Sequence, residues 1–216
     1  MAEFFHKKKA VIACLCSLVL VVVCLLQAYR FEKATQVVGK AFYFLLERTE
    51  NAETCAVLSY QKGGAGYVFS ENFVAHACYL EESSAQTVCE KLSATKKTEI
   101  VKVGGEILYQ TRGKEDAFKG VDTLCKCIRI LSDVADGLTQ SLTQEKADGL
   151  LKDVERVLFG LQKRFEGKED GLASLCAEIK RWSEKAREGI IYAKDLRYIA
   201  CFAALNIVEL EKEYGA

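Results

Sequence analysis

The sequence predicts an α+β protein with an N-terminal transmembrane helix, a sheet unit of the order βαββαβ and a C-terminal antiparallel helical bundle. Three observations lead to this fold class: an uncharged apolar run near the N-terminus, two similar strand–helix–strand segments after it, and apolar residues at helical spacing from there to the end. The predicted organisation is a cytoplasmic tail over 1–9, a transmembrane helix over 10–28, a linker over 29–39, the sheet unit over 40–105 and a helical domain over 106–216.

The apolar run at 10–26 is long enough to cross most of the hydrocarbon core of a bilayer, since a helix rises about 1.5 Å per residue. It carries no charge, and the lysines at 7–9 stand directly before it. Basic residues favour the cytoplasmic side of a membrane. The sequence therefore predicts a single-pass cell-membrane protein, with a cytoplasmic N-terminus and with everything after Tyr29 outside the cytoplasm.

A cleaved signal peptide, a lipoprotein signal and a buried core helix are the alternatives for this run. Leu25 and Leu26 stand where signal cleavage requires a small residue, which disfavours cleavage without excluding it. The stretch VIAC at 11–14 resembles a lipobox, but the apolar run before Cys14 is shorter than the ~7–15 apolar residues of a signal. A membrane span fits the run better than any of them.

Composition limits the possible partners. The chain has 30 basic and 30 acidic side chains and no net charge. Nucleic-acid binding requires a strongly basic face, and the overall balance gives no sign of one. We therefore do not expect nucleic acid as a partner.

Seven cysteines lie on the predicted outer side, and an odd number cannot pair completely. Several fall at or beside apolar positions of helical period, where buried thiols are common. Disulfide frameworks belong to small loop-rich domains, whereas this chain is rich in regular structure. We therefore expect free buried thiols rather than a disulfide framework at these positions: Cys55, Cys78, Cys89, Cys125, Cys127, Cys176 and Cys201.

The sequence contains no recognisable catalytic motif. Outside the N-terminal tail His76 is the only histidine, and VAHACY around it contains no HExxH, CxxC or Gly-x-Ser-x-Gly. The glycine run at 63–66 lacks the Lys-Ser/Thr of a phosphate-binding loop and predicts a turn. We therefore expect no enzyme activity, no cofactor and no metal.

The sheet unit consists of two similar copies. Strands are predicted at 41–47, 66–70, 72–79 and 98–103, and helices at 51–62, capped by Asn51, and at 83–93. The order βαββαβ is that of the ferredoxin-like split unit, whose two helices cover one face of the sheet. The other face is predicted to be open, which makes it a natural binding surface.

Residues 40–104 resemble the SPOR domain, a βαββαβ module of bacterial envelope proteins. The resemblance rests on ENAETCAVL at 50–58, GGAGYV at 63–68 and ESSAQTVCEKL at 82–92, which stand at the spacing of the family. The resemblance implies a protein that binds the glycan strands of peptidoglycan in cell division or sporulation. It implies no catalytic reaction. Tyr43 stands where the family's strand glutamine is expected.

Strand alternation selects the candidate glycan-binding residues. If the even-numbered residues of the strand at 41–47 pack under the two helices, Tyr43 faces the open side. Tyr67 lies on an adjoining strand, and the offset of the repeat places His76 outward as well. An aromatic ring with a hydrogen-bonding tip suits a sugar, so Tyr43, Tyr67 and His76 are the predicted site. The alternative is that they are ordinary sheet residues, and a slip of one position would reverse the faces.

From Lys114 onward the apolar spacing predicts three or four antiparallel helices. The last apolar segment, 190–210, contains Lys194, Asp195 and Arg197, so burial in a bundle explains it better than a second membrane span. This helical domain is either an interaction or spacer module or a companion that stabilises the sheet unit.

Two functional hypotheses follow from the sequence. The first is a membrane-anchored, extracytoplasmic module that binds peptidoglycan. The second is a non-enzymatic envelope scaffold, in which a degenerate SPOR-like sheet and the helical bundle bind other envelope proteins.

Overall fold

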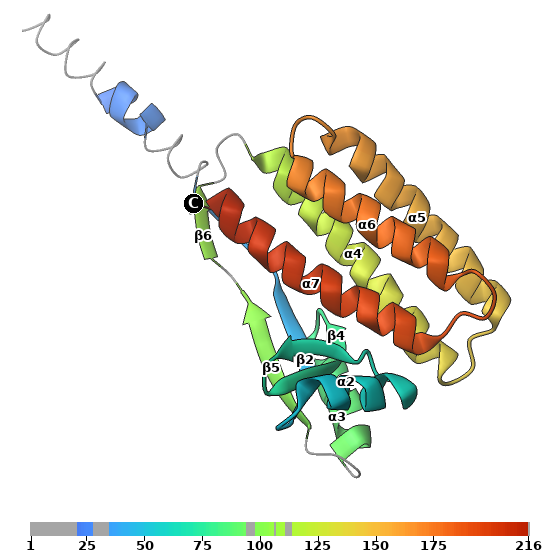
Figure 1. Cartoon of the computed structure of the whole chain (residues 1–216). Coiled ribbons are helices and arrows are strands. Elements are labelled where there is room, and N and C mark those ends of the chain that lie inside the picture. The colour runs from blue at the N-terminus through green and yellow to red at the C-terminus, as the bar shows by residue number, and fades with distance from the viewer. Residues whose placement is uncertain (1–20, 28–34, 94–97, 106, 111–113, 216) are drawn as a thin grey trace, which may run out of the picture.

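The computed structural model describes residues 21–27, 35–93, 98–105, 107–110 and 114–215. In these residues a four-stranded antiparallel sheet with two covering helices lies beside a bundle of four longer helices, as Figure 1 shows. A separate two-stranded sheet lies at the far end of the bundle, near the C-terminus. The fold is therefore built from a sheet unit and a helical layer that face one another.

The elements of the sheet unit follow one another in the predicted order βαββαβ. They are β2 (Ala41–Arg48), α2 (Ala52–Gln61), β3 (Tyr67–Ser70), β4 (Phe73–Tyr79), α3 (Glu82–Ser93) and β5 (Thr98–Gly104). The strands stand in the order β3-β4-β2-β5, and each neighbouring pair is antiparallel. The first and third strands of the unit are thus central, which is the arrangement of a ferredoxin-like unit.

Local chemistry explains where α2 begins and ends. The side-chain oxygen of Asn51 accepts a hydrogen bond of 2.9 Å from the backbone N–H of Thr54, which makes Asn51 the predicted N-cap. After the helix, Gly63 and Gly66 have φ of 89° and 62°, a region that favours glycine. The glycine run at 63–66 is therefore the predicted turn, and it leads the chain directly into β3.

A strand pair that no local pattern predicts joins the two ends of the sheet unit. β1 (Thr35–Val38), inside the predicted linker, pairs antiparallel with β6 (Ile107–Gln110), inside the predicted helical domain. The pairing partners lie on either side of the whole sheet unit in the sequence. The two strands come close enough to pair only once the sheet unit between them has folded.

The helical layer consists of α4 (Glu115–Leu138), α5 (Gln144–Phe165), α6 (Asp170–Ala186) and α7 (Ala193–Gly215). Each helix packs on the next, and α7 returns to pack on α4. The apolar residues predicted at helical spacing form the core of this layer, where Leu124, Ile128 and Leu158 are fully buried. Burial also explains the apolar last segment, because α7 packs on α4, on α6 and on β4 of the sheet.

The second face of the sheet is not open, so this part of the prediction is wrong. Phe42, Phe44 and Leu46 of β2 are fully buried and belong to one core with residues of α4 and α7. On the opposite face Leu45 packs against Ala85 of α3. The sheet is thus covered on both sides, which is why β2 reads as a continuous apolar run rather than as an alternating one.

The predicted fold class also needs a correction at the N-terminus. No helix in the described ranges is both long and apolar enough to cross a membrane. The transmembrane helix predicted at 10–28 lies mostly outside those ranges, and the part inside them, 21–27, is a short helix with exposed side chains. The architecture that the structure describes is therefore the sheet unit, the strand pair and the helical layer.

Five cysteines of the predicted set are buried free thiols, as the sequence predicts. Cys78, Cys125, Cys127, Cys176 and Cys201 are buried, while the other two of the predicted set, at 55 and 89, are partly buried. Burial raises the pKa of Cys125 to about 12 and that of Cys127 to about 11. These thiols act as small apolar side chains and are poor nucleophiles.

Candidate functional site

The three predicted glycan-binding residues do not lie together. Tyr43 is partly buried on the α3 side of the sheet. Tyr67 lies on the opposite side, where its ring contacts that of Tyr198 in α7 with the centroids 5.3 Å apart. His76 is 4% exposed and lies beneath α2, with its ring bonded to Ser59. The sheet therefore offers no open platform made of these side chains.

A β-bulge explains the position of His76. The register between β2 and β4 shifts between Leu45, which pairs with Ala77, and Leu46, which pairs with Ala75. His76 is the extra residue of β4 at this point. The strand alternation used in the sequence prediction breaks there, and the imidazole turns toward α2.

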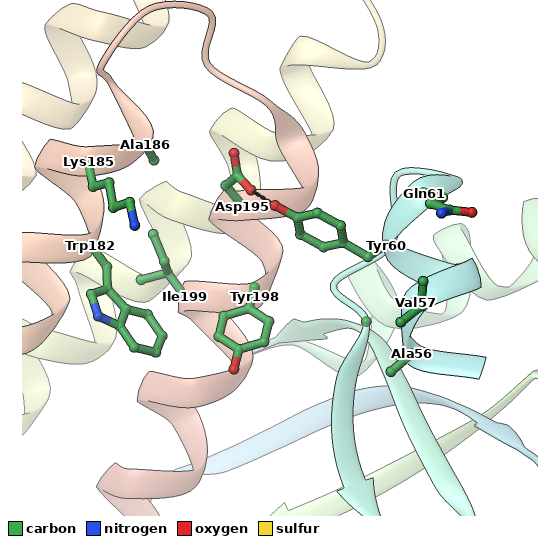
Figure 2. Close-up of a pocket in the computed structure, with 11 residues that line it drawn as sticks. Ala56, Val57, Tyr60, Gln61, Trp182, Lys185, Ala186, Asp195, Tyr198 and Ile199 are labelled. Carbon is green, nitrogen blue, oxygen red and sulfur yellow. Dashed lines mark hydrogen bonds between the residues drawn. The ribbon is translucent and has the colours of Figure 1, made fainter. Parts of the chain in front are cut away.

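A cleft lies between the sheet unit and the helical layer. It has a volume of about 850 Å³ and opens between α2 on one side and α6 and α7 on the other (Figure 2). Its lining residues are Ala56, Val57, Tyr60, Gln61, Gly66, Trp182, Lys185, Ala186, Asp195, Tyr198 and Ile199. Apolar and aromatic side chains therefore form most of its walls, with a few polar groups among them, as in many ligand sites.

Stacked aromatic rings form the wall on the side of α6 and α7. The ring of Trp182 lies 5.5 Å from that of Tyr198 and 4.7 Å from that of Phe202, measured between centroids. Trp182 and Tyr198 are partly buried, so each ring is held by packing and still reaches the cleft. Across the cleft, Val57 of α2 is 57% exposed and presents an apolar surface to them.

The polar groups gather at the end of the cleft where α7 begins. The hydroxyl of Tyr60 donates a hydrogen bond to Asp195, as the dashed line in Figure 2 shows. Burial, together with this bond, raises the pKa of Tyr60 to about 12, so the phenol stays protonated at neutral pH. The ammonium of Lys194 lies 4.3 Å from the centroid of the Tyr60 ring, and Lys185 adds a second, exposed ammonium from α6.

A hydrogen-bonded junction beside the cleft holds its walls in place. Arg197 of α7 donates to the carbonyl of Gly63 at 2.7 Å and to Asp136 of α4 at 2.8 Å. Asp136 also accepts a bond of 2.9 Å from the hydroxyl of Tyr79 in β4. Burial of the phenol and the negative charge of Asp136 both raise the pKa of Tyr79. The turn after α2, the sheet and two helices are thus joined through the pair of Arg197 and Asp136, which pre-organises the cleft.

A second arrangement surrounds His76 on the other side of α2. Ser59 Oγ lies 2.6 Å from His76 Nδ1, and Glu47 Oε2 lies 2.7 Å from Nε2. The three residues come from α2, β4 and β2, and a cavity of about 260 Å³ lies beside Ser59 and Glu47. A hydroxyl, an imidazole and a carboxylate in series can move a proton from the hydroxyl to the ring.

In the described parts of the chain, no group of three or more His, Cys, Asp or Glu side chains is placed to hold a metal ion. Comparison with family models, with curated proteins and with solved structures finds no match to this chain. The resemblance to the SPOR domain therefore rests on the sequence motifs alone.

Sequence reasoning missed the residues of both cavities. The cleft joins α2 to helices more than a hundred residues later, and no local pattern connects them. One usable signal was Trp182, the only tryptophan of the chain, which shares an amphipathic helix with charged neighbours. For the second cavity no short motif exists, since Glu47, Ser59 and His76 approach one another only through the sheet and α2.

Proposed function

We propose that the protein is a binding protein of the cell envelope that holds a glycan segment of peptidoglycan in the cleft between α2 and helices α6 and α7. The observation that carries the proposal is the aromatic wall of Trp182 and Tyr198, facing Val57 across a cavity of about 850 Å³. The SPOR-like motifs of the sheet unit supply the choice of peptidoglycan as the glycan.

The chemistry of the cleft suits a sugar. The C–H face of a pyranose packs on an aromatic ring, and its hydroxyls need donors and acceptors at the edges. Gln61, Lys185 and Asp195 supply such groups around the rings. The fixed rings of Trp182 and Tyr198 would lose little freedom on binding, which favours affinity.

This proposal moves the site away from the sheet face. Tyr43 and His76 lie on the side of the sheet that α2 and α3 cover, so they take no part in the proposed contact. Tyr67 supports it indirectly, because its ring backs that of Tyr198. The proposed function is still glycan binding, as expected from the sequence, but the proposed binding surface is the cleft instead of the sheet face.

A matched pair of substitutions on α2 tests the proposal. Val57 lines the cleft, whereas its neighbour Leu58, 48% exposed, does not. Val57→Glu places a carboxylate in the apolar wall and should weaken co-sedimentation with purified peptidoglycan about tenfold or more, the equivalent of ~1–2 kcal/mol. Leu58→Glu adds the same charge one position away and should bind as the unmodified chain does.

Two outcomes would contradict the cleft as the glycan site. One is binding by Val57→Glu equal to that of Leu58→Glu. The other is no sedimentation of the folded, unmodified chain with the wall. Circular dichroism of each variant should match the parent, because both side chains are about half exposed and neither belongs to the buried core.

The second candidate function is an envelope scaffold, and one observation favours it. Just before α7, Ile190 and Tyr192 are 63% and 49% exposed, and the ammonium of Lys194 lies over both the Tyr192 ring and the Tyr60 ring of the cleft. A protein partner could cover the cleft and these two exposed side chains together, which a sugar would not. A photo-crosslinking residue at position 192 should then link the chain to an envelope protein, and Val57→Glu should abolish the link.

Either function requires that residues 40–216 face the cell wall. A protease added to intact protoplasts should then digest a tag fused to the C-terminus. Protection of the tag, with digestion only after lysis, would contradict the proposed location and both candidate functions.

A further inference from the structure

We propose that Ser59, His76 and Glu47 form a nucleophilic site that accepts a small acyl group from an ester bound in the cavity beside α2. This activity goes beyond glycan binding, since it uses the cavity of about 260 Å³ and not the cleft. It also departs from the expectation drawn from sequence motifs, because the three residues become neighbours only in the folded chain.

The geometry is that of a nucleophile, a base and a group that orients the base. The two hydrogen bonds of the His76 ring, 2.6 Å to Ser59 Oγ and 2.7 Å to Glu47 Oε2, both lie within the range of catalytic contacts. The N–H at Nε2 donates to the Glu47 carboxylate. In the neutral ring Nδ1 is then the acceptor for the Ser59 hydroxyl, and this is the form that can take its proton.

Gly64 shows that the turn after α2 is shaped around this pair. A Cβ at position 64 would lie 2.5 Å from Ser59 Oγ and 2.8 Å from His76 Nδ1. The backbone N–H of Gly64 also donates to the carbonyl of Ser59 at 2.9 Å. Only a residue without a side chain lets the turn close over the hydroxyl and the ring, which keeps both nearly free of solvent at 1% and 4% exposure.

The adjoining cavity sets the class of substrate. Ser59 and Glu47 line it together with the polar side chains of Thr49, Asn51, Thr54 and Lys62. Its volume of about 260 Å³ lies below that of pockets for drug-sized ligands, so it suits a short acyl group such as acetyl. The amide of Asn51 and the ammonium of Lys62 are the groups able to stabilise negative charge on a carbonyl oxygen.

The proposed reaction has two steps that balance. Ser59 Oγ attacks the ester carbonyl carbon while its proton passes to His76 Nδ1, and Glu47 stays ionised beside the imidazolium. The bond from carbon to the alkoxy oxygen then breaks, and the alcohol leaves with the proton from Nδ1. Water attacks the acyl-Ser59 in the same way, which releases the carboxylic acid and restores the serine.

A fluorophosphonate probe tests whether the serine is reactive. An activated serine displaces fluoride from phosphorus and forms a stable adduct. On the folded full chain, mass spectrometry should find one adduct, at Ser59. The adduct should be absent from Ser59→Ala, and its formation should slow 100-fold or more in His76→Asn. Thr87→Val is the matched control, since it removes an exposed hydroxyl of α3 that does not line the cavity, and it should label at the parent rate.

A hydrogen-bonded histidine that only stabilises the fold would give different results. No adduct on the folded chain would overturn the proposal, and so would an unchanged labelling rate in His76→Asn. Glu47→Gln keeps the size of the side chain and an acceptor oxygen and provides a second variant should His76→Asn fail to fold. It should slow labelling tenfold or more, and release of nitrophenol from p-nitrophenyl acetate should fall in parallel. Labelling of this folded variant at the parent rate would also overturn the proposal.

Discussion

At the scale of single residues, Glu211 is the clearest case of an ionisable side chain whose burial lowers the stability of the fold. Its side chain is 2% exposed, and Oε2 accepts a bond of 2.9 Å from the backbone N–H of Lys40. Burial raises the pKa of Glu211 to about 7 despite this bond and the nearby Lys40 ammonium. Between about pH 4.5 and 7, the folded chain therefore holds a proton at Glu211 that the unfolded chain has released.

The sign of the pH dependence follows from this shift. Because the pKa of Glu211 is higher in the folded state, its contribution to stability is fully present below about pH 4.5 and is lost as the pH rises toward about 7. Glu211→Gln keeps the acceptor without the charge, so it should stabilise the chain by about 1–3 kcal/mol at pH 8 and change little at pH 4. Urea denaturation at the two pH values measures this difference, and an equal effect at both would contradict it.

At the scale of the helices, two glycines within regular helices differ in their surroundings. One lies at a close contact between helices, and the other lies at an open surface. A Cβ on Gly120 of α4 would lie 2.5 Å from Phe165 Cε2 and 2.8 Å from Leu172 Cδ2, which belong to the end of α5 and the start of α6. Gly160 of α5 has no such neighbour within 4 Å. Gly120 therefore allows three helices to meet, whereas Gly160 has no packing role that a methyl group would disturb.

Alanine at the two glycines should therefore act in opposite directions. Gly120→Ala overpacks the contact and should destabilise by about 1–3 kcal/mol, which exceeds the gain in helix propensity. Gly160→Ala should stabilise by roughly 0.5–1 kcal/mol, because only the propensity term applies. Midpoints of chemical denaturation compare the two variants, and a stabilising Gly120→Ala would disprove the packing described here.

At the scale of the whole molecule, the sheet unit and the helical layer share one core. Phe42, Phe44 and Leu46 lie between them, and Arg197 joins both through Gly63 and Asp136. Separation of the layers would expose these side chains to water. The described chain should therefore unfold as one cooperative unit.

A fragment of residues 35–110 tests this dependence. Without α4 and α7 its sheet would expose one apolar face, so it should bind a hydrophobic dye and show no sharp thermal transition. The full chain serves as the control and should give a single transition. A fragment that melts sharply and does not bind the dye would show that the sheet unit folds alone.

The order of the elements could be predicted from the sequence because its causes are local. The cap at Asn51, the glycines at 63–66 and the helical spacing after Lys114 each act over a few residues. What covers the sheet could not be predicted in this way, although the continuous apolar run at 42–46 is typical of a strand buried on both faces. The bulge at His76, and the approach of the His76 ring to Ser59 and Glu47, depend on the strand register and on how α2 packs. Strand alternation alone predicts neither of these.

The cleft, and not a face of the sheet, is the proposed binding site for the glycan. Hydrogen exchange of the full chain, with and without soluble peptidoglycan fragments, measures this most directly. Binding in the cleft predicts slower exchange in α2, over 52–61, and in the segment from 182 to 199, with little change in β2 and β4. Protection confined to β2 and β4, with none in α2 or in 182–199, would contradict the cleft as the binding site.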